Sequence, residues 1–201
     1  MRIKDFSKTG VVALALTGLL GAVPVYAEDC PTAKTAAQGF IVERGASKME
    51  VFHAGPTEVR SVLRYGGQTL LEVTAFQGLV DLERIDRGNR ISYRPISDLT
   101  KTFPPVPGKK TSAVLEETRD GKKIMRTYIL EVRKGSDTLY LGACKYNVLR
   151  IDRSAMEGKQ TYFINTDYYA PELKLVLAKE YRESDGRTTL NKFEKIYPTP
   201  R

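Results

Sequence analysis

The chain has 201 residues, a formal net charge of +8, one histidine and two cysteines. One histidine and a cysteine pair expected to be oxidised leave too few ligands for a zinc site, so we expect no metal and no cofactor. The charged residues are scattered rather than clustered, which argues against nucleic acid as a partner.

The first 27 residues have the composition of a secretory signal peptide. Arg2, Lys4 and Lys8 give a basic start, residues 10–23 are apolar and uncharged, and Val25-Tyr26-Ala27 resembles a cleavage site. The alternative is a membrane anchor, but an apolar core of about 14 residues is shorter than the roughly 20 that a spanning helix needs. We therefore expect cleavage near Ala27 and a periplasmic or secreted protein of residues 28–201.

The signal segment carries three basic residues and one acidic residue, so the net charge of +8 becomes +6 in the exported part. A basic surface favours anionic partners, and we expect an apolar or anionic ligand of the cell envelope together with contact to a membrane surface. The alternative, a mixed solvated surface, is the more common case. The exported length suits a single domain with a substantial core, and the sequence does not indicate an oligomeric state.

Cys30 and Cys144 are the only cysteines, and both lie in the exported part. In an oxidising compartment an isolated pair is typical of one disulfide. A redox pair is the alternative, but the chain has no Cys-x-x-Cys motif. Glu28 and Asp29 precede Cys30 where a lipidation site needs small apolar residues, so we expect no lipid there.

Apolar and aromatic runs between Gly, Asp and Pro turns predict antiparallel hairpins along the chain. In the second half we expect strands at Thr138–Arg153, Thr161–Tyr169, Lys174–Glu183 and Arg187–Tyr197, with turns at Gly158, Pro171 and Gly186. Earlier strands are expected at Phe40–Arg44, Met49–His53, Glu58–Tyr65, Thr69–Gln77, Leu79–Ile85, Arg90–Ile96, Val114–Arg119 and Ile124–Arg133. The sequence predicts a mainly β fold, a curved antiparallel meander or incomplete β-barrel with few short helices.

Four features of the sequence allow alternatives. Residues 31–38 are compatible with a lead-in or a short helix, and one helix over residues 69–85 has apolar spacing in its favour but Gly78 in its middle. The Pro-rich stretch 98–110 is expected to be a loop inside one domain, although a linker between domains is the alternative. Arg84-Ile85-Asp86-Arg87 recurs as Arg150-Ile151-Asp152-Arg153, which indicates either an old duplication or a chance likeness of charged strand ends.

The stretch Tyr168-Tyr169-Ala170-Pro171-Glu172-Leu173-Lys174-Leu175-Val176, followed by Lys179-Glu180 and Gly186, resembles the end of small exported proteins of the lipoprotein-carrier superfamily (LolA/LolB-like). The resemblance extends over residues 111–197. It implies an incomplete antiparallel barrel whose apolar concave face is plugged by helices. The chain departs from the pattern because it has no Trp, and its candidates for plugging helices are limited to residues 31–38 and 69–77.

No motif in the chain points to catalysis, and we expect no catalytic residue. His53 has no evident nucleophile or orienting carboxylate, so we interpret it as a structural residue at a strand end. The carboxylate pairs Glu116-Glu117 and Asp152 with Glu157 are expected to be surface charges. Gly66-Gly67 lacks the Lys-Ser/Thr sequence and the following helix of a phosphate-binding loop.

Three functions remain, in descending order of preference. The first is a non-catalytic periplasmic binding protein whose apolar concave face handles a lipid or another envelope component. The second is a structural or interaction protein of the envelope, and the third is an enzyme acting on envelope glycan or peptide. If a cavity exists, the inward residues of the second half are the expected ligand-binding set: Tyr140, Tyr146, Val148, Tyr162, Ile164, Leu175 and Leu177.

Overall fold

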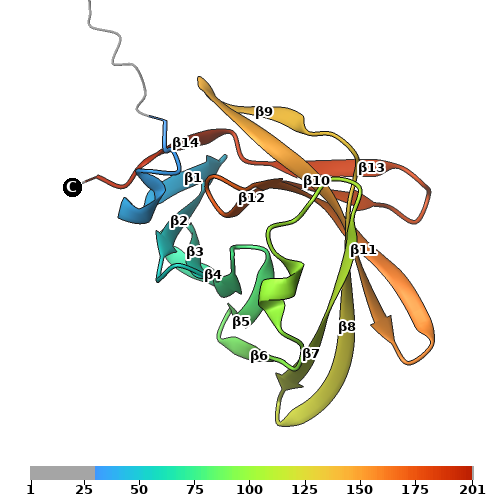
Figure 1. Cartoon of the computed structure of the whole chain (residues 1–201). Helices are drawn as coiled ribbons and strands as arrows, with labels where there is room; N and C mark the ends of the chain where they lie inside the picture. Colours follow the sequence, from blue (N-terminus) through green and yellow to red (C-terminus); the bar gives the residue numbers. More distant parts are fainter. Residues whose placement is uncertain (1–29, 201) are drawn as a thin grey trace, which may run out of the picture.

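The structure of the protein, a computed structural model, describes residues 30–200. Fourteen strands form one curved antiparallel sheet (Figure 1), in the order β13-β12-β11-β10-β8-β7-β6-β5-β4-β3-β2-β1-β14, and β9 pairs with β10 off this path. The predicted fold class, a mainly β curved antiparallel sheet with few short helices, is confirmed. The predicted signal peptide and its cleavage site lie outside the described residues.

Along the chain the strands are accompanied by two short 3-10 helices, η1 before β1 and η2 between β6 and β7. They are η1 (Ala36–Gln38), β1 (Phe40–Arg44), β2 (Ser47–His53), β3 (Glu58–Tyr65), β4 (Gln68–Phe76), β5 (Val80–Asp86), β6 (Asn89–Pro95), η2 (Leu99–Thr102), β7 (Lys110–Arg119), β8 (Lys122–Val132), β9 (Asp137–Leu141), β10 (Cys144–Glu157), β11 (Gln160–Ala170), β12 (Leu175–Arg182), β13 (Thr188–Lys192) and β14 (Lys195–Pro198). Within residues 30–200, no helix has the length and apolar content needed to cross a membrane.

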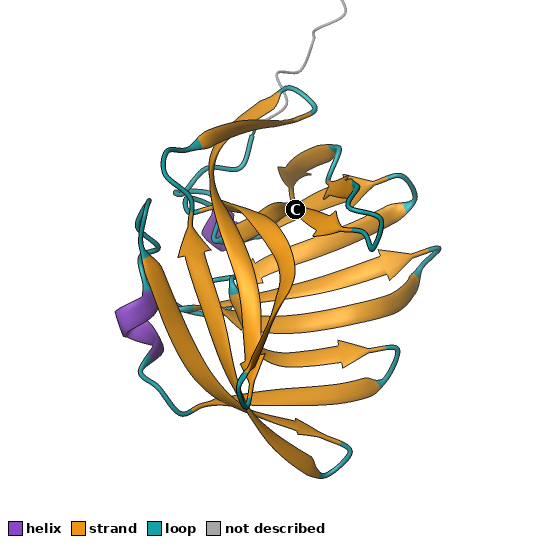
Figure 2. Ribbon diagram, turned by 90° about the vertical axis from the view of Figure 1, so that its right-hand side faces the viewer, coloured by secondary structure: helices purple, strands orange, loops and turns teal. Residues whose placement is uncertain are grey.

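Tight glycine turns place a row of hairpin connections along one side of the sheet, which we call the rim (Figure 2). The β3–β4 turn is typical, because Gly66 and Gly67 both have positive φ, of 55° and 83°, which side chains disfavour. The Pro-rich segment connects β6 to β7, which are neighbours in the same sheet, and Asp98 caps η2 within it by accepting a hydrogen bond from the Thr100 amide. The chain on both sides of the prolines therefore builds one sheet.

The side opposite the rim, which we call the closed end, brings together turns that are far apart in the sequence. Gly78, in the β4–β5 turn, has φ +65°, and a Cβ atom there would overlap the carbonyl group of Lys174 in the β11–β12 turn. The Tyr169 hydroxyl donates to the Gln77 carbonyl at 2.8 Å, and Lys174 Nζ donates to the Pro56 carbonyl at 2.6 Å. These contacts hold two distant parts of the sheet face to face, so the sheet curls.

The segment between β13 and β14 joins the two edges of the sheet. The Phe193 amide donates to the Leu177 carbonyl on β12 at 3.2 Å, whereas the next amide, of Glu194, donates to the Glu43 carbonyl on β1 at 2.7 Å. The prediction of one strand over Arg187–Tyr197 is therefore wrong. The chain crosses from one edge of the sheet to the other at Phe193.

Three other expectations need correction. Thr138–Arg153 is not one strand, because Gly142 and Ala143 form a turn that separates β9 from β10. The alternative helix over residues 69–85 is wrong, since β4 and β5 pair there across the Gly78 turn. Among the described residues no helix plugs the concave face, and residues 31–38 contribute only the single turn η1.

Buried apolar side chains form two clusters on the curled sheet. One lies where β1, β2 and β14 meet β12 and the β9–β10 hairpin, and it includes Phe40, Val51, Leu141, Leu177 and Ile196. The other lies among β5, β7, β8, β10 and β11, and its members include Leu115, Leu130 and Ile151. Burial of these side chains is the main favourable contribution to folding of the sheet.

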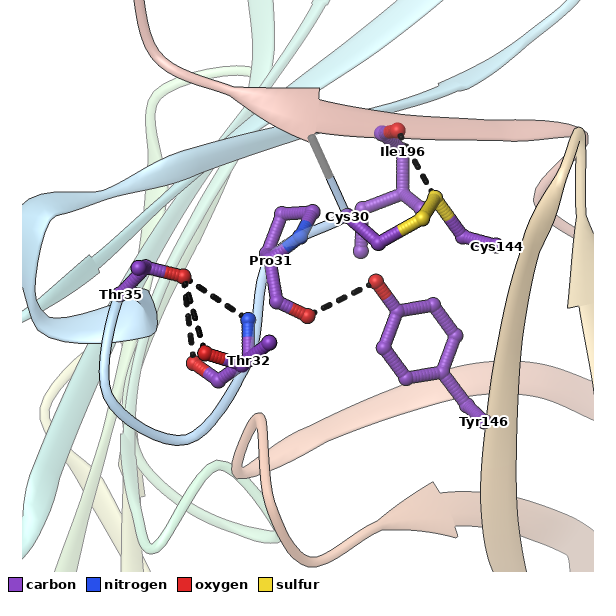
Figure 3. Close-up of a disulfide and its surroundings, with 7 residues drawn as sticks. All are labelled: Cys30, Pro31, Thr32, Thr35, Cys144, Tyr146 and Ile196. Atoms are coloured by element: carbon purple, nitrogen blue, oxygen red, sulfur yellow. Dashed lines mark hydrogen bonds between the residues drawn. A yellow bond between two sulfur atoms is a disulfide. The ribbon is translucent and has the colours of Figure 1, made fainter. Parts of the chain in front are cut away.

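The predicted disulfide is present between Cys30 and Cys144, with a Cα–Cα distance of 5.5 Å (Figure 3). It joins the first described residue to the start of β10. Beside it the Tyr146 hydroxyl donates to the Pro31 carbonyl at 3.0 Å. The segment that leads into β1 is therefore attached to the core by both a covalent and a polar contact.

Removal of this disulfide is expected to destabilise the protein strongly. The bond closes a loop with a sequence separation of 114, for which the chain-entropy model gives about 4–5 kcal/mol. We expect Cys30→Ala/Cys144→Ala to lower the urea midpoint accordingly, and reduction of the wild type to lower it equally. An unchanged midpoint in both samples would show that the bond contributes nothing to stability.

Candidate functional site

A cavity of about 350 Å³, partly open to solvent, lies between β2–β5 on one side and β12–β13 on the other. This volume lies in the range of small-molecule sites, which measure about 300–1,000 Å³. Two further hollows at the closed end are lined by residues of turns, of the 3-10 helices and of strand ends, one beside Phe103 and one beside His53. Only the first cavity lies under the sheet itself.

The apolar wall of the cavity follows directly from strand register. Met49 on β2 pairs with Leu63 on β3, and Leu63 pairs with Leu71 on β4, so the three side chains share one face of the sheet. Val59 and Val73 lie on the same face and also line the cavity. The opposite wall is formed by apolar residues of β12 and the crossing segment: Leu175, Val176, Ala178 and Phe193.

A buried ion pair lies at the cavity wall. Arg153 on β10 donates to the Asp167 carboxylate on β11 at 2.6 Å, and its side chain is 12% exposed while that of Asp167 is 0% exposed. Arg153 also donates to the Leu79 carbonyl at 2.7 Å, and Lys179 Nζ lies 3.8 Å from the second oxygen of Asp167. The guanidinium group thus links β10 and β11 to the β4–β5 turn across the curl.

The protonation equilibria of this pair follow from burial and from opposite charge. Burial opposes ionisation of Asp167, but the charges of Arg153 and Lys179 outweigh it and hold the pKa of Asp167 below its ordinary value. Burial likewise opposes the charge on Arg153, but the negative charge of Asp167 has the larger effect, so the pKa of Arg153 is raised. Both groups are therefore charged at neutral pH.

A second polar cluster lies on the same face of the sheet, between β6, β7 and β8. The Glu117 side chain is 3% exposed and lies 3.3 Å from Arg119 and 3.5 Å from Arg126. The expectation that Glu117 is a surface charge is therefore wrong, because alternation on β7 turns it to the same side as Leu115. Tyr93 and Tyr128 pack edge to face beside it, and burial raises the pKa of both phenols.

The predicted ligand-binding residues occupy four environments. Leu175 lines the cavity. Tyr146, Val148 and Leu177 belong to the buried cluster near the disulfide, Ile164 is half-buried, and Tyr140 and Tyr162 are exposed. The structure thus brings one of the seven to the cavity, and a binding role for each stays a prediction.

Sequence patterns did not indicate most of the cavity lining. Ser61, Leu63, Leu71 and Val73 come from the first half of the chain, where alternation of apolar residues on β3 and β4 is the one available signal. Arg153 and Lys179 look like ordinary charged residues of half-exposed strands. The burial of Arg153 and the position of Lys179 at the cavity depend on the pairing of strands, which the sequence alone does not specify.

His53 and Asp152 do not line the cavity and are engaged in contacts elsewhere. His53 Nε2 donates to the Leu173 carbonyl at 3.1 Å, and its ring packs against Phe40. Asp152 accepts two hydrogen bonds from Arg133, at 2.8 and 2.9 Å. Among residues 30–200, no group of three or more His, Cys, Asp and Glu side chains is placed to hold a metal ion.

Comparisons with known proteins give structural likeness only. No family model matches the chain, and no curated protein matches it. The solved structure of the hypothetical lipoprotein YmcC from Escherichia coli K12 is similar over 86% of this chain and 92% of its own, with a TM-score of 0.47 and 10% identity. A protein from Bacteroides fragilis NCTC 9343, described as having a YmcC-like fold, is similar over 79% and 92%, with a TM-score of 0.35 and 12% identity.

Neutralising Asp167 is expected to destabilise the fold. Asp167→Asn leaves the Arg153 charge buried without its partner, which costs about 3–5 kcal/mol in comparable pairs. Because the folded pKa of Asp167 is lowered, its contribution is present above the unfolded value near 3.8 and is lost as the pH falls through the folded pKa.

The measurement is urea unfolding of wild type and Asp167→Asn between neutral pH and the acid range, with Asp185→Asn as the control. Asp185 makes its ion pair with Arg187 at the exposed β12–β13 turn, where such pairs contribute little. Equal unfolding midpoints for Asp167→Asn and wild type at neutral pH would contradict the assigned role of the ion pair.

Proposed function

We propose that the protein is a non-catalytic binding protein of the cell envelope that holds an apolar ligand, such as a lipid chain, in the cavity under its curled sheet. The observation that carries the proposal is the cavity of about 350 Å³, with apolar side chains on two facing walls. Apolar ligands gain affinity in such sites because their surface is removed from water.

The location of the apolar lining favours a ligand site over an incompletely packed core. Leu63, Leu71 and Val73 are only half-buried although their side chains point to the concave face. The fully buried clusters share Val59, Leu79 and Leu175 with the cavity lining, whereas most of their members, among them Leu141 and Leu130, do not line it. The protein therefore has a packed core without filling this space.

The same proposal accounts for the absence of a recognisable reaction centre among the described residues. In the buried Arg153–Asp167 pair each charge is balanced by the other, and Arg153 donates a further hydrogen bond to the Leu79 carbonyl. This ion pair stabilises the cavity wall, which is what a binding protein requires of the residues at this position. The predicted signal peptide supports the envelope as the place of action.

Filling the cavity is expected to abolish binding while the fold is kept. In Ser61→Trp the new ring enters the cavity from β3, so we expect loss of binding of the neutral apolar dye Nile red, measured by fluorescence. Arg60→Trp is the matched control, because Arg60 is the preceding residue, points to the outer face and has a side chain 56% exposed.

Native mass spectrometry of the exported wild type provides the complementary measurement. We expect a co-purified apolar ligand in the wild type and Arg60→Trp, and none in Ser61→Trp. If wild type binds neither dye nor any co-purified molecule, the proposed function is wrong. Equal binding by Ser61→Trp and Arg60→Trp would also refute the proposed function, because the cavity is filled in the first variant and open in the second.

A further inference from the structure

We infer that the ligand of this cavity is an anionic amphiphile, an apolar chain that ends in a carboxylate or phosphate group, and that Arg84 and Lys179 bind its charged end. The inference rests on the function proposed above and specifies the chemical class of the ligand. The observation behind it is an excess of cationic side chains in a cavity whose walls are otherwise apolar.

The charges of the lining do not cancel. Five lining side chains are cationic, namely Arg44, Arg84, Arg153, Lys179 and Lys192, and one is anionic, Asp81. Asp86 and Asp167 are the ion-pair partners of Arg84 and Arg153, so three carboxylates face five cations. The cavity thus has an excess of two positive charges, and an anion entering it would reduce this excess.

Of the three lining cations that have an ion-pair partner, Lys179 has the longest ion pair. Its ammonium group lies 3.8 Å from Asp167, a carboxylate that already binds Arg153 at 2.6 Å and also accepts from Asn165. Its side chain is 43% exposed, so the ammonium group is accessible. One carboxylate is shared by two cations here, which leaves Lys179 able to bind a further anion.

Arg84 supplies the second contact from the opposite side of the cavity. It lies on β5, where it pairs across the sheet with Val73 of the apolar wall. Its ion pair with Asp86 is 3.2 Å long through one nitrogen, and its side chain is 34% exposed. A guanidinium group has five N–H donors, so it can keep Asp86 and still bind an oxyanion.

Two other cations add to the positive potential. Within residues 30–200, Arg44 and Lys192 have no carboxylate at ion-pair distance, and Lys192 donates only to the Tyr140 carbonyl at 3.3 Å. Cavities with low-dielectric walls concentrate such a field and attract ligands of opposite charge. This potential favours an anion over a neutral or cationic end group of the same length.

Asp81 is the one feature that would favour a cationic ligand, and its surroundings argue against that. The charge of Asp81 lies close enough to Arg153 to raise the pKa of that guanidinium. Asp81 and Asp167 therefore both act on Arg153, in the wall of the cavity. Among residues 30–200, Lys179 only shares Asp167 with Arg153, and no lining carboxylate is left to compensate Arg44 and Lys192.

The test compares ligands with one apolar chain and four end groups: dodecanoate, dodecyl phosphate, dodecanol and dodecylammonium. Each is measured at neutral pH and low salt by its displacement of Nile red. We expect both anions to bind about tenfold or more tightly than dodecanol, because hydrogen bonds to charged groups are the strong ones. Dodecylammonium should bind most weakly, and any difference between the two anions identifies which end group the site prefers.

The variant Arg84→Met/Lys179→Met removes both cations but keeps long apolar side chains. Its matched control is Arg90→Met/Lys145→Met, which removes two exposed cations that do not line the cavity. We expect the first variant to bind the anions and dodecanol equally and the control to keep the wild-type preference. Circular dichroism of both variants verifies folding.

The possible failures are distinct. If all four ligands bind the wild type equally, the inference is overturned while the proposed function stands. If none binds, the proposed function fails and the inference fails with it. If the anion preference persists in the folded Arg84→Met/Lys179→Met variant, these two residues are not the anion site. Should that variant not fold, the order of the four ligands in wild type still decides whether the ligand is anionic.

Discussion

The hydrogen bonds of Arg153 are the constraint on which the curled shape depends. Strand pairing determines the relative position of neighbouring strands only. It does not by itself determine the curvature of a long antiparallel sheet. Arg153 joins Asp167 on β11 to the Leu79 carbonyl at the start of β5, which lies several strands away in the sheet order. Arg153 and Asp167 lie on neighbouring strands and stay paired, so opening of the curl would break the hydrogen bond to Leu79 and leave that carbonyl without its donor.

Two further features work in the same direction. At the closed end Gly78 permits the β4–β5 turn to touch the β11–β12 turn at Lys174, where any side chain would collide. Near the rim the successive residues Phe193 and Glu194 bond to opposite edges of the sheet. Together these contacts set the separation of the two walls, and that separation leaves a space lined by Leu63, Val73 and Leu175. The proposed binding function is a consequence of this spacing.

Turn chemistry made the fold largely predictable, because Gly66-Gly67, Gly88, Gly121 and Gly186 each end a run of alternating residues. The failures have physical causes. Gly142-Ala143 lies inside an apolar run, so β9 and β10 looked like one strand. Phe193-Glu194 continues the alternation of β13 although the backbone there leaves one edge for the other. The turn between β9 and β10 does contain a glycine with positive φ, Gly142, but the apolar residues around it hid this signal, and the change of edge at Phe193 has no marker in residue type.

The candidate site was harder to predict because its residues come from strands distant in sequence. A register shift between Tyr168 and Tyr169 on β11 alters the alternation on β12, so Leu175 and Val176 both line the cavity while Leu177 enters the core. Likewise Lys179 belongs to a strand whose charges looked solvent-facing. Which charged residues face inward depends on these bulges and on the curl, and neither can be derived from composition.

Methyl-resolved NMR shows whether the space between the two walls takes up an apolar chain. Dodecanoate is titrated into the protein, and the leucine and valine methyl signals are followed. The account predicts shifts for Leu63, Leu71, Val73 and Leu175, and unchanged signals for the core residues Leu130 and Leu141. Shifts confined to exposed residues such as Leu190, with the cavity methyls unchanged at saturation, would contradict it.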